Sequence, residues 1–172
     1  MLTQNLKCWN MLSQKYGIKY LSTHSACPHI TISAGKCADA GKFKQAVHSC
    51  LAQCMPITIE ANGLGIFVEE TPVIYIRWFL SSELMDMRMY FQEGLMNVYS
   101  ESDKTTQEEV WLPKSTLAIN DVSYDQLPLV LNEFRSYDFE QKMLVNRVML
   151  MEVDRKEVII DEISLDSFCL GD

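Results

Sequence analysis

The sequence predicts an α+β protein made of two pseudo-symmetric lobes, each a small, mainly antiparallel sheet with flanking helices, around a central cleft. Three observations lead to this expectation. Stretches with the apolar spacing of helices alternate with short stretches rich in β-branched residues. The second half of the chain repeats the order of elements in the first half. The length of 172 residues suits one domain, or two small lobes that share a core.

The composition excludes several classes of protein. With 48% hydrophobic and 22% charged residues, the chain has the balance of a globular protein rather than of a disordered or collagen-like one. Only 15 Lys and Arg residues stand against 23 Asp and Glu residues, so long duplex nucleic acid, which needs a basic face, is not an expected partner. Neither a signal-peptide pattern nor a run of roughly 18 apolar residues occurs, so we expect a cytoplasmic protein with no membrane partner.

Helices are predicted where apolar residues recur every three or four positions. The first covers about residues 3–16 and ends at Gly17, since glycine commonly follows the last turn of a helix. The second begins after Asp39, a favourable N-cap residue, and the third begins after a cap at Ser81 or Ser82.

Strands are predicted where β-branched and aromatic residues cluster between turn signals. Residues 19–25 indicate a connection, and the polar stretch 100–109 indicates a surface loop that divides the two halves. A short fourth helix at 128–134 starts on a proline, and a hairpin near the C-terminus has residues 154–157 as its turn. The predicted strands cover 27–33, 57–60, 66–68, 73–79, 111–119, 143–153 and 158–163, and the strand at 66–68 is either separate or a continuation of the strand at 57–60.

An internal repeat supports the two-lobe expectation. Pro28 and Thr31 recur as Pro113 and Thr116 with the same internal spacing, and both pairs lie in a predicted strand that precedes a helix. The offset from Pro28 to Pro113, which we call the repeat offset, also relates Val68, Glu69, Val73 and Ile74 to Val153, Asp154, Val158 and Ile159. The chain is therefore predicted to be a duplicated α+β unit.

The repeat also predicts how the chain is divided. We expect one bilobal domain over residues 1–172, with the first lobe at about 18–98 and the second at about 110–165. The N-terminal helix at about 3–16 precedes the first lobe. Two related lobes that pack about a pseudo-two-fold axis place equivalent strands on opposite sides of one cleft, so that their side chains share a pocket.

Four side chains are predicted to share this cleft. His29 and Thr31 come from the first lobe, and Lys114 and Thr116 come from the second. Positions i and i+2 of a strand lie on the same face, so each pair projects together. An imidazole transfers protons near neutral pH, and threonine hydroxyls can donate to the phosphate oxygens that carry charge in a phosphodiester transition state. This chemistry needs no metal, so we expect no cofactor.

Two short motifs resemble those of a known family. Residues 28–33, Pro-His-Ile-Thr-Ile-Ser, resemble the first signature of the two-histidine (2H) phosphoesterases, which include the RNA 2′,3′-cyclic phosphodiesterases called 2′-5′ RNA ligases. Residues 111–118 resemble the second signature, which contains Pro-His-aliphatic-Thr-Leu-Ala. The resemblance implies a nucleotide or RNA terminus with a phosphate as the partner. It also implies that His29 is the acid or base and that Thr31 and Thr116 are the phosphate donors.

The second motif departs from the family pattern at one position. Lys114 stands where the second histidine of the family belongs, and neither His24 nor His48 lies in a motif. A lysine of ordinary pKa cannot act as a base at neutral pH, although it can neutralise phosphate, or donate a proton if burial lowers its pKa.

The sequence therefore leaves two functions of a phosphate site open, besides an interaction module that uses the exposed sheet or the first helix. One is a 2H phosphoesterase-like enzyme with impaired activity on a 2′,3′-cyclic phosphate, in which His29 is the remaining acid or base. The alternative is a non-catalytic protein of the same fold that binds a nucleotide or an RNA end. The sequence does not indicate an oligomeric state.

Aromatic and thiol side chains give two further expectations. Trp111 and Tyr75 are candidate substrate-binding residues that could stack on a nucleobase, and the alternative is that they pack in the core. His48, Cys50 and Cys54 have a spacing faintly similar to that of metal ligands, but no second cluster completes four ligands. We expect free thiols and no metal site.

Overall fold

A four-stranded antiparallel sheet carries the second motif. The structure, a computed structural model, describes residues 2–107 and 110–168. The sheet has the strand order β5-β3-β2-β6. Its strands are β2 (Ile57–Phe67), β3 (Val73–Trp78), β5 (Lys114–Ala118) and β6 (Lys142–Val145). Two strands come from each half of the chain, so both halves build this sheet.

Helices flank the sheets, and their caps follow from the sequence. The α-helices of the described residues are α1 (Leu2–Tyr16), α2 (Tyr20–His24), α3 (Ala40–Leu51), α4 (Ser82–Leu95) and α5 (Leu127–Phe134). The predicted caps are confirmed, because the Asp39 carboxylate accepts the backbone N–H groups of Gly41 and Lys42, each at 3.0 Å. Ser81 Oγ accepts the N–H of Leu84 at 3.2 Å. None of these helices has the length and apolar character needed to cross a membrane.

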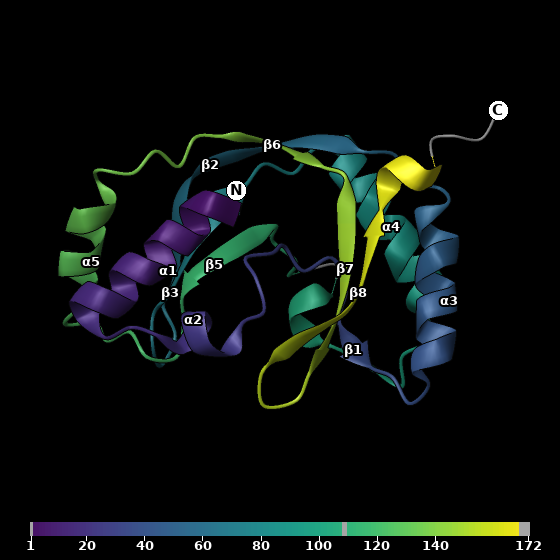
Figure 1. Cartoon of the computed structure of the whole chain (residues 1–172), viewed down its shortest axis with the longest axis horizontal. Coiled ribbons are helices and arrows are strands. Elements are labelled where there is room, and N and C mark those ends of the chain that lie inside the picture. Colours follow the sequence, from purple (N-terminus) through teal and green to yellow (C-terminus); the bar gives the residue numbers. More distant parts are fainter. Residues whose placement is uncertain (1, 108–109, 169–172) are drawn as a thin grey trace.

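Two smaller antiparallel sheets complete the fold. The predicted hairpin is confirmed, and it pairs β7 (Arg147–Val153) with β8 (Glu157–Ser164). A short pair joins β1 (Gly35–Lys36) to β4 (Glu101–Ser102). In Figure 1, the hairpin crosses the middle of the molecule, with β5, α1 and α5 on one side of it and α3 and α4 on the other.

One core joins the sheet to the helices. Ile74 and Ile76 of β3 have no exposed surface, and Leu12 of α1, Leu51 of α3 and Leu84 of α4 are at most 1% exposed. Full burial of such a side chain stabilises a fold by about 1.5–3 kcal/mol. Helices packed on antiparallel sheets confirm the predicted α+β class.

The structure differs from the sequence expectations in the stretch that carries the first motif. The predicted strand at 27–33 is absent, and residues 26–34, which we call the first-motif segment, are in no strand. A high strand propensity forms a ladder only where another strand offers its free edge, and no strand of the described residues pairs with this segment. The connection expected at 19–25 contains the short helix α2.

The two strand segments expected at 57–60 and 66–68 form one strand, β2, which confirms the alternative that the second continues the first. The pairing of β2 shifts between Ala61 and Leu64. Gly63 lies at that irregularity with a φ of 71°, which glycine adopts without strain. Conversely, the strand expected at 143–153 is divided into β6 and β7, because its first part pairs with β2 and its second part with β8.

The repeat offset also relates elements of the structure. Moved by this offset, α3 overlaps α5, β2 overlaps β6 and β7, and β3 falls within β8. The order helix, strand, strand is therefore found in both halves, whereas the strand that the repeat predicts before the helix is present in the second half, as β5, and absent from the first-motif segment.

Candidate functional site

A cavity of about 240 Å³ brings the two motifs together. The side chains of His29, Thr31, Lys114 and Thr116 all contribute to its lining. The other walls come from α1, α2, the residues that follow β5, and the first residue of β8. In Figure 1, the chain that follows α2 runs between β5 and the hairpin. Residues that are far apart in the sequence thus meet at one place.

The strand β5 holds the second motif in a fixed orientation. Lys114 lies opposite Arg77 and Thr116 lies opposite Tyr75 in the ladder with β3. Ser115, between the two site residues, points to the other face of the strand, where it is fully buried. Alternation along β5 therefore directs Lys114 and Thr116 together into the cavity.

A backbone carbonyl fixes the tautomer of His29. Its Nδ1 lies 2.8 Å from the carbonyl oxygen of Cys27, and a carbonyl can only accept a hydrogen bond. Nδ1 therefore carries the hydrogen, and Nε2 of the neutral ring has the free lone pair. With 22% of the side chain exposed, His29 can exchange protons with water or with a bound molecule.

Glu157 is a site residue that the sequence did not indicate. Its carboxylate lies 3.9 Å from Nδ1 of His29 and accepts the backbone N–H of Ala26 at 3.0 Å. It also accepts a hydrogen bond from Ser25 Oγ. Shifting Glu157 back by the repeat offset leads to Pro72, so the repeat offers no counterpart that could have pointed to it.

Lys114 keeps its charged group beside an aromatic ring. Its Nζ lies 5.6 Å from the centre of the Phe67 ring, an arrangement that stabilises the ammonium. Burial lowers the pKa of Lys114, and the carboxylates of Glu69 and Asp103 oppose this effect without cancelling it. The ammonium can therefore neutralise an anion, and it releases its proton more readily than an exposed lysine does.

Tryptophan side chains anchor both motifs through backbone carbonyls. The indole Nε1–H of Trp9 donates to the carbonyl of Thr116 at 3.1 Å. The indole Nε1–H of Trp111 donates to the carbonyl of Thr31 at 2.9 Å. The chain has three tryptophans, and the third, Trp78, donates to Ser115 Oγ at 3.1 Å.

The predicted substrate-binding residues Trp111 and Tyr75 do not line this cavity. Trp111 has its N–H engaged by Thr31, and one face of its ring contacts the guanidinium of Arg88. Tyr75 is 6% exposed, and its ring packs 4.5 Å from that of Phe67 and directly over Gly65. Both aromatic rings therefore contact the protein itself, which agrees with the core alternative.

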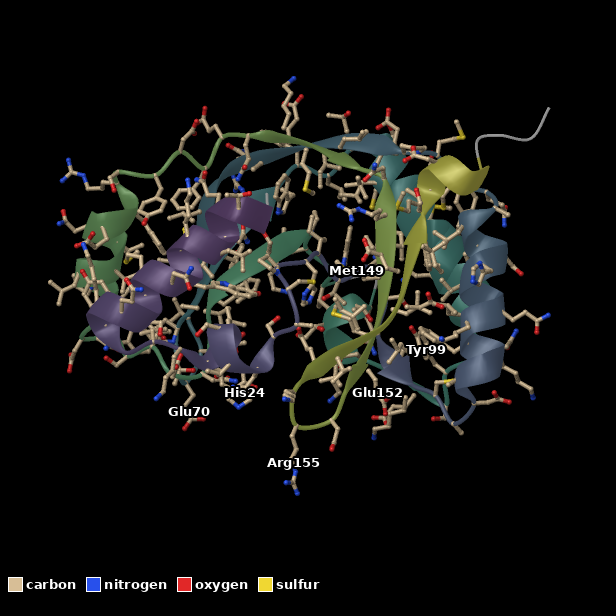
Figure 2. The ribbon with its side chains drawn as sticks, viewed as in Figure 1. His24, Glu70, Tyr99, Met149, Glu152 and Arg155 are labelled. Carbon is tan, nitrogen blue, oxygen red and sulfur yellow. The ribbon has the colours of Figure 1, made fainter. Side chains whose placement is uncertain are left out.

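The other histidines lie outside the cavity lining. His24 stacks on Tyr20 with ring centres 4.5 Å apart. It lines a smaller neighbouring cavity of about 90 Å³ between α2 and the tip of the hairpin. Figure 2 shows His24 at α2 and Arg155 extending outward from that tip. His48 is exposed on α3.

The described residues include no group of three His, Cys, Asp or Glu side chains that could hold a metal ion. The spacing of His48, Cys50 and Cys54 does not form a site because the histidine is exposed while both thiols are buried. Cys8, Cys27, Cys37, Cys50 and Cys54 are free thiols. Cys169 lies outside the described residues.

Two short motifs that line one cavity, one of them supplying a histidine and the other a lysine, are typical of a phosphate-handling protein. The comparison with known families agrees, because the model of the 2′-5′ RNA ligase superfamily matches residues 9–157. The protein belongs to this superfamily, whose members are 2H phosphoesterases. The family expected from the two motifs is therefore confirmed. No curated protein matches the chain.

Proposed function

We propose that the protein acts on a 2′,3′-cyclic phosphate at the end of a nucleotide or an RNA, with His29 as its proton-transfer group. What supports this proposal most is that both motifs contribute to the lining of one cavity, although they come from opposite halves of the sequence. Membership of the 2′-5′ RNA ligase superfamily supports a phosphate-bearing nucleotide as the substrate class.

In the proposed hydrolysis, a water oxygen forms a bond to phosphorus while the bond from phosphorus to one ribose oxygen breaks. Nε2 of His29 takes the proton of the attacking water, since Nδ1 is engaged with Cys27. The departing ribose oxygen takes a proton from the ammonium of Lys114, whose pKa is lowered by burial. Solvent then removes the proton from His29 and returns one to Lys114, which restores both groups.

The remaining site residues stabilise charge. The hydroxyls of Thr31 and Thr116 donate to the non-bridging phosphate oxygens, where negative charge increases in the transition state. Each threonine backbone is anchored by a tryptophan N–H, so the donors are already oriented before the substrate arrives. The Lys114 ammonium adds a positive charge on the face of β5 that also carries Thr116.

One observation favours a second candidate, a non-catalytic protein that binds a nucleotide or an RNA end. His29 is the one histidine in the lining of the cavity among the described residues, and the family mechanism uses two. Loss of one acid–base partner typically costs about 10²–10⁴ in rate. A protein with Lys114 in this place keeps attraction for phosphate even where turnover is slow.

Hydrolysis of a panel of 2′,3′-cyclic nucleotides, with calorimetry on the same compounds, separates the two candidates. We expect turnover by the wild type, loss of turnover in His29→Ala, and wild-type turnover in His48→Ala, whose exposed imidazole lies on α3. Binding without turnover supports the second candidate. Wild-type protein that neither binds nor hydrolyses any member of the panel overturns both.

We also infer that the chain is a duplicated unit with two pseudo-symmetric lobes at about 18–98 and 110–165. The support is the repeat offset, which relates α3 to α5 and β3 to β8. The four-stranded sheet contains strands from both ranges, so the two lobes share this sheet. A cytoplasmic location stays a prediction from the sequence.

A further inference from the structure

The first-motif segment lacks the support that strand β5 gives to the second motif. Residues 26–34 form no ladder, whereas Lys114 and Thr116 are held opposite Arg77 and Tyr75 of β3. The position of the first motif relative to the second therefore depends on tertiary contacts, which include the packing of Ile30 and Ile32 against the core and a hydrogen bond from Ser33 Oγ to the Tyr99 hydroxyl at 3.3 Å.

Asp103, Thr106 and Trp111 hold the C-terminal part of this segment. Trp111 donates its indole N–H to the carbonyl of Thr31 at 2.9 Å. The backbone N–H of Asp103 donates to the carbonyl of Ala34 at 2.9 Å, and Thr106 Oγ1 donates to the same carbonyl at 3.4 Å. Of these three hydrogen bonds, only the one from Trp111 reaches a residue that lines the cavity, namely Thr31.

At the other end, the segment is attached to the hairpin. Glu157 accepts hydrogen bonds from Ser25 and Ala26, and the Cys27 thiol donates to Met149 Sδ at 3.5 Å. Figure 2 marks Met149 on β7 in the middle of the molecule. Two different parts of the second half of the chain thus hold the segment at its two ends.

Arg88 in turn holds Thr106 and Trp111 against α4. It is 1% exposed, and its Nη2–H donates to the carbonyl of Thr106 at 2.8 Å. Its guanidinium carbon lies 4.6 Å from the centre of the Trp111 ring, and Nη1–H donates to Gln92 Oε1 at 2.9 Å, one turn further along α4. A planar guanidinium can make two directed hydrogen bonds and stack on an aromatic ring at once, which a lysine ammonium cannot do.

We propose that Trp111, backed by Arg88, is a positioning residue that sets the place of Thr31, and with it His29, against the second motif. Its catalytic consequence rests on the proposed function. Displacement of a reacting group by about 1 Å can cost on the order of 10²-fold in rate, so a residue that contacts no substrate can control turnover in this way. Trp111 was expected to bind substrate, and its contacts give it this different role.

Hydrogen–deuterium exchange tests the positioning directly and without any substrate. Trp111→Phe keeps an aromatic ring but removes the N–H donor. Arg88→Lys keeps the positive charge but removes the planar guanidinium. We expect faster exchange for both variants at the Asp103 amide, which donates to Ala34, and at the Ala26 amide, which donates to Glu157, with β5 unchanged. Trp78→Phe is the matched control, because it removes a buried indole N–H that bonds Ser115 and not the first-motif segment.

Kinetics with 2′,3′-cyclic AMP test the catalytic consequence. We expect kcat per folded molecule to fall by about 10- to 100-fold in Trp111→Phe and Arg88→Lys, with little change in KM, at a temperature where both are fully folded. A purely structural role would instead lower the unfolding temperature and leave kcat per folded molecule unchanged. Arg135→Lys, an exposed arginine after α5, should match the wild type in both measurements.

The outcomes distinguish this inference from the proposed function. A wild type that neither binds nor hydrolyses 2′,3′-cyclic AMP overturns the proposed function, while exchange at the Asp103 and Ala26 amides still decides whether Trp111 positions the segment. Where the wild type binds without turnover, its Kd replaces kcat as the second readout. Unchanged exchange in both variants, or kcat within about twofold of the wild type, overturns the positioning role.

Discussion

Nδ1 of His29 donates to the carbonyl of Cys27 at 2.8 Å, a contact between residues two positions apart in a segment without strand pairing. The bond defines which nitrogen can take a proton, and it holds the ring in the lining of the cavity that Lys114 and Thr116 also line. Proton transfer at this site therefore depends on Nε2 of His29 and on Lys114, the proposed proton donor in the same lining.

Restoring the second histidine should raise activity. In Lys114→His, the imidazole would occupy the position that the family pattern assigns to the missing acid–base group, so we expect hydrolysis of 2′,3′-cyclic AMP to rise by about 10²-fold. Initial rates at neutral pH measure this effect. Lys142→His, in which an exposed lysine paired with Glu60 is changed, should leave the rate as it is. A folded Lys114→His protein that is no faster than the wild type would contradict the proposed role of position 114.

Anion binding should weaken as the pH rises, because Lys114 loses its charge. This loss should begin at a lower alkaline pH than for a lysine of ordinary pKa. Burial lowers the pKa of Lys114, so the ammonium loses its proton as the pH rises through that lowered value. We expect the Kd for 2′,3′-cyclic AMP to increase in that alkaline range. Lys114→Arg should remove the increase, because a guanidinium stays protonated. Titration calorimetry between neutral and alkaline pH checks this, and identical profiles for the two proteins would rule the explanation out.

The lowered pKa of Lys114 also makes the free energy of unfolding depend on pH. The unfolded chain holds the Lys114 proton up to the ordinary lysine range, whereas the folded protein releases it earlier. The unfolded state therefore binds more protons between the two values, and this group makes the unliganded fold more stable as the pH rises through that interval. Urea unfolding of the wild type and of Lys114→Met at several alkaline pH values should show this difference in slope.

Each site threonine should contribute through its hydroxyl. Thr31→Val and Thr116→Val keep the β-branched shape but remove the donor to phosphate, and loss of one such donor typically costs about 10²–10³ in kcat. Thr58→Val, on an exposed position of β2, serves as the control and should be fully active. Equal kcat in all four proteins, the wild type included, would show that neither hydroxyl contacts the reacting phosphate.

Glu157 should act on His29 both by its charge and by holding the first-motif segment. Glu157→Gln keeps an oxygen that can accept from Ser25 and Ala26, whereas Glu157→Ala loses every acceptor. We therefore expect kcat for 2′,3′-cyclic AMP to fall in the order wild type, Gln variant, Ala variant, with a loss of up to about 10²-fold at the end of the series. Equal kcat in the two variants would mean that the hydrogen bonds from Ser25 and Ala26 to residue 157 do not affect turnover. Glu152→Gln, another hairpin carboxylate, is the control (Figure 2).

Thiol reactivity should follow burial. Burial raises the pKa of Cys8 to about 12 and that of Cys54 to about 11, so both are present as unreactive thiols at pH values near 8. Cys37 is exposed and should be alkylated by iodoacetamide before the other four described cysteines. Peptide mass spectrometry after short labelling times measures the order. Rapid labelling of Cys8 in the folded protein would contradict the burial of the face of α1 that carries Cys8.

Local patterns in the sequence were sufficient for most helices and for the hairpin. The Asp39 and Ser81 caps and the stop at Gly17 depend on residues within one turn of each helix end, so the sequence contains all that is needed. The strand expected at 27–33 was wrong because strand formation depends on a partner edge, and the sequence does not show which edges are free.

By itself, the sequence determined the two motifs, their common spacing and the exchange of a histidine for Lys114, because residue identity and position are all that these need. Only the tertiary structure decided how the first motif is held. Glu157 reaches His29 from the hairpin, and Trp111 reaches Thr31 from another segment, so neither contact has a local signal. Long-range packing also lowers the pKa of Lys114, since burial is a property of the folded chain and not of the residue.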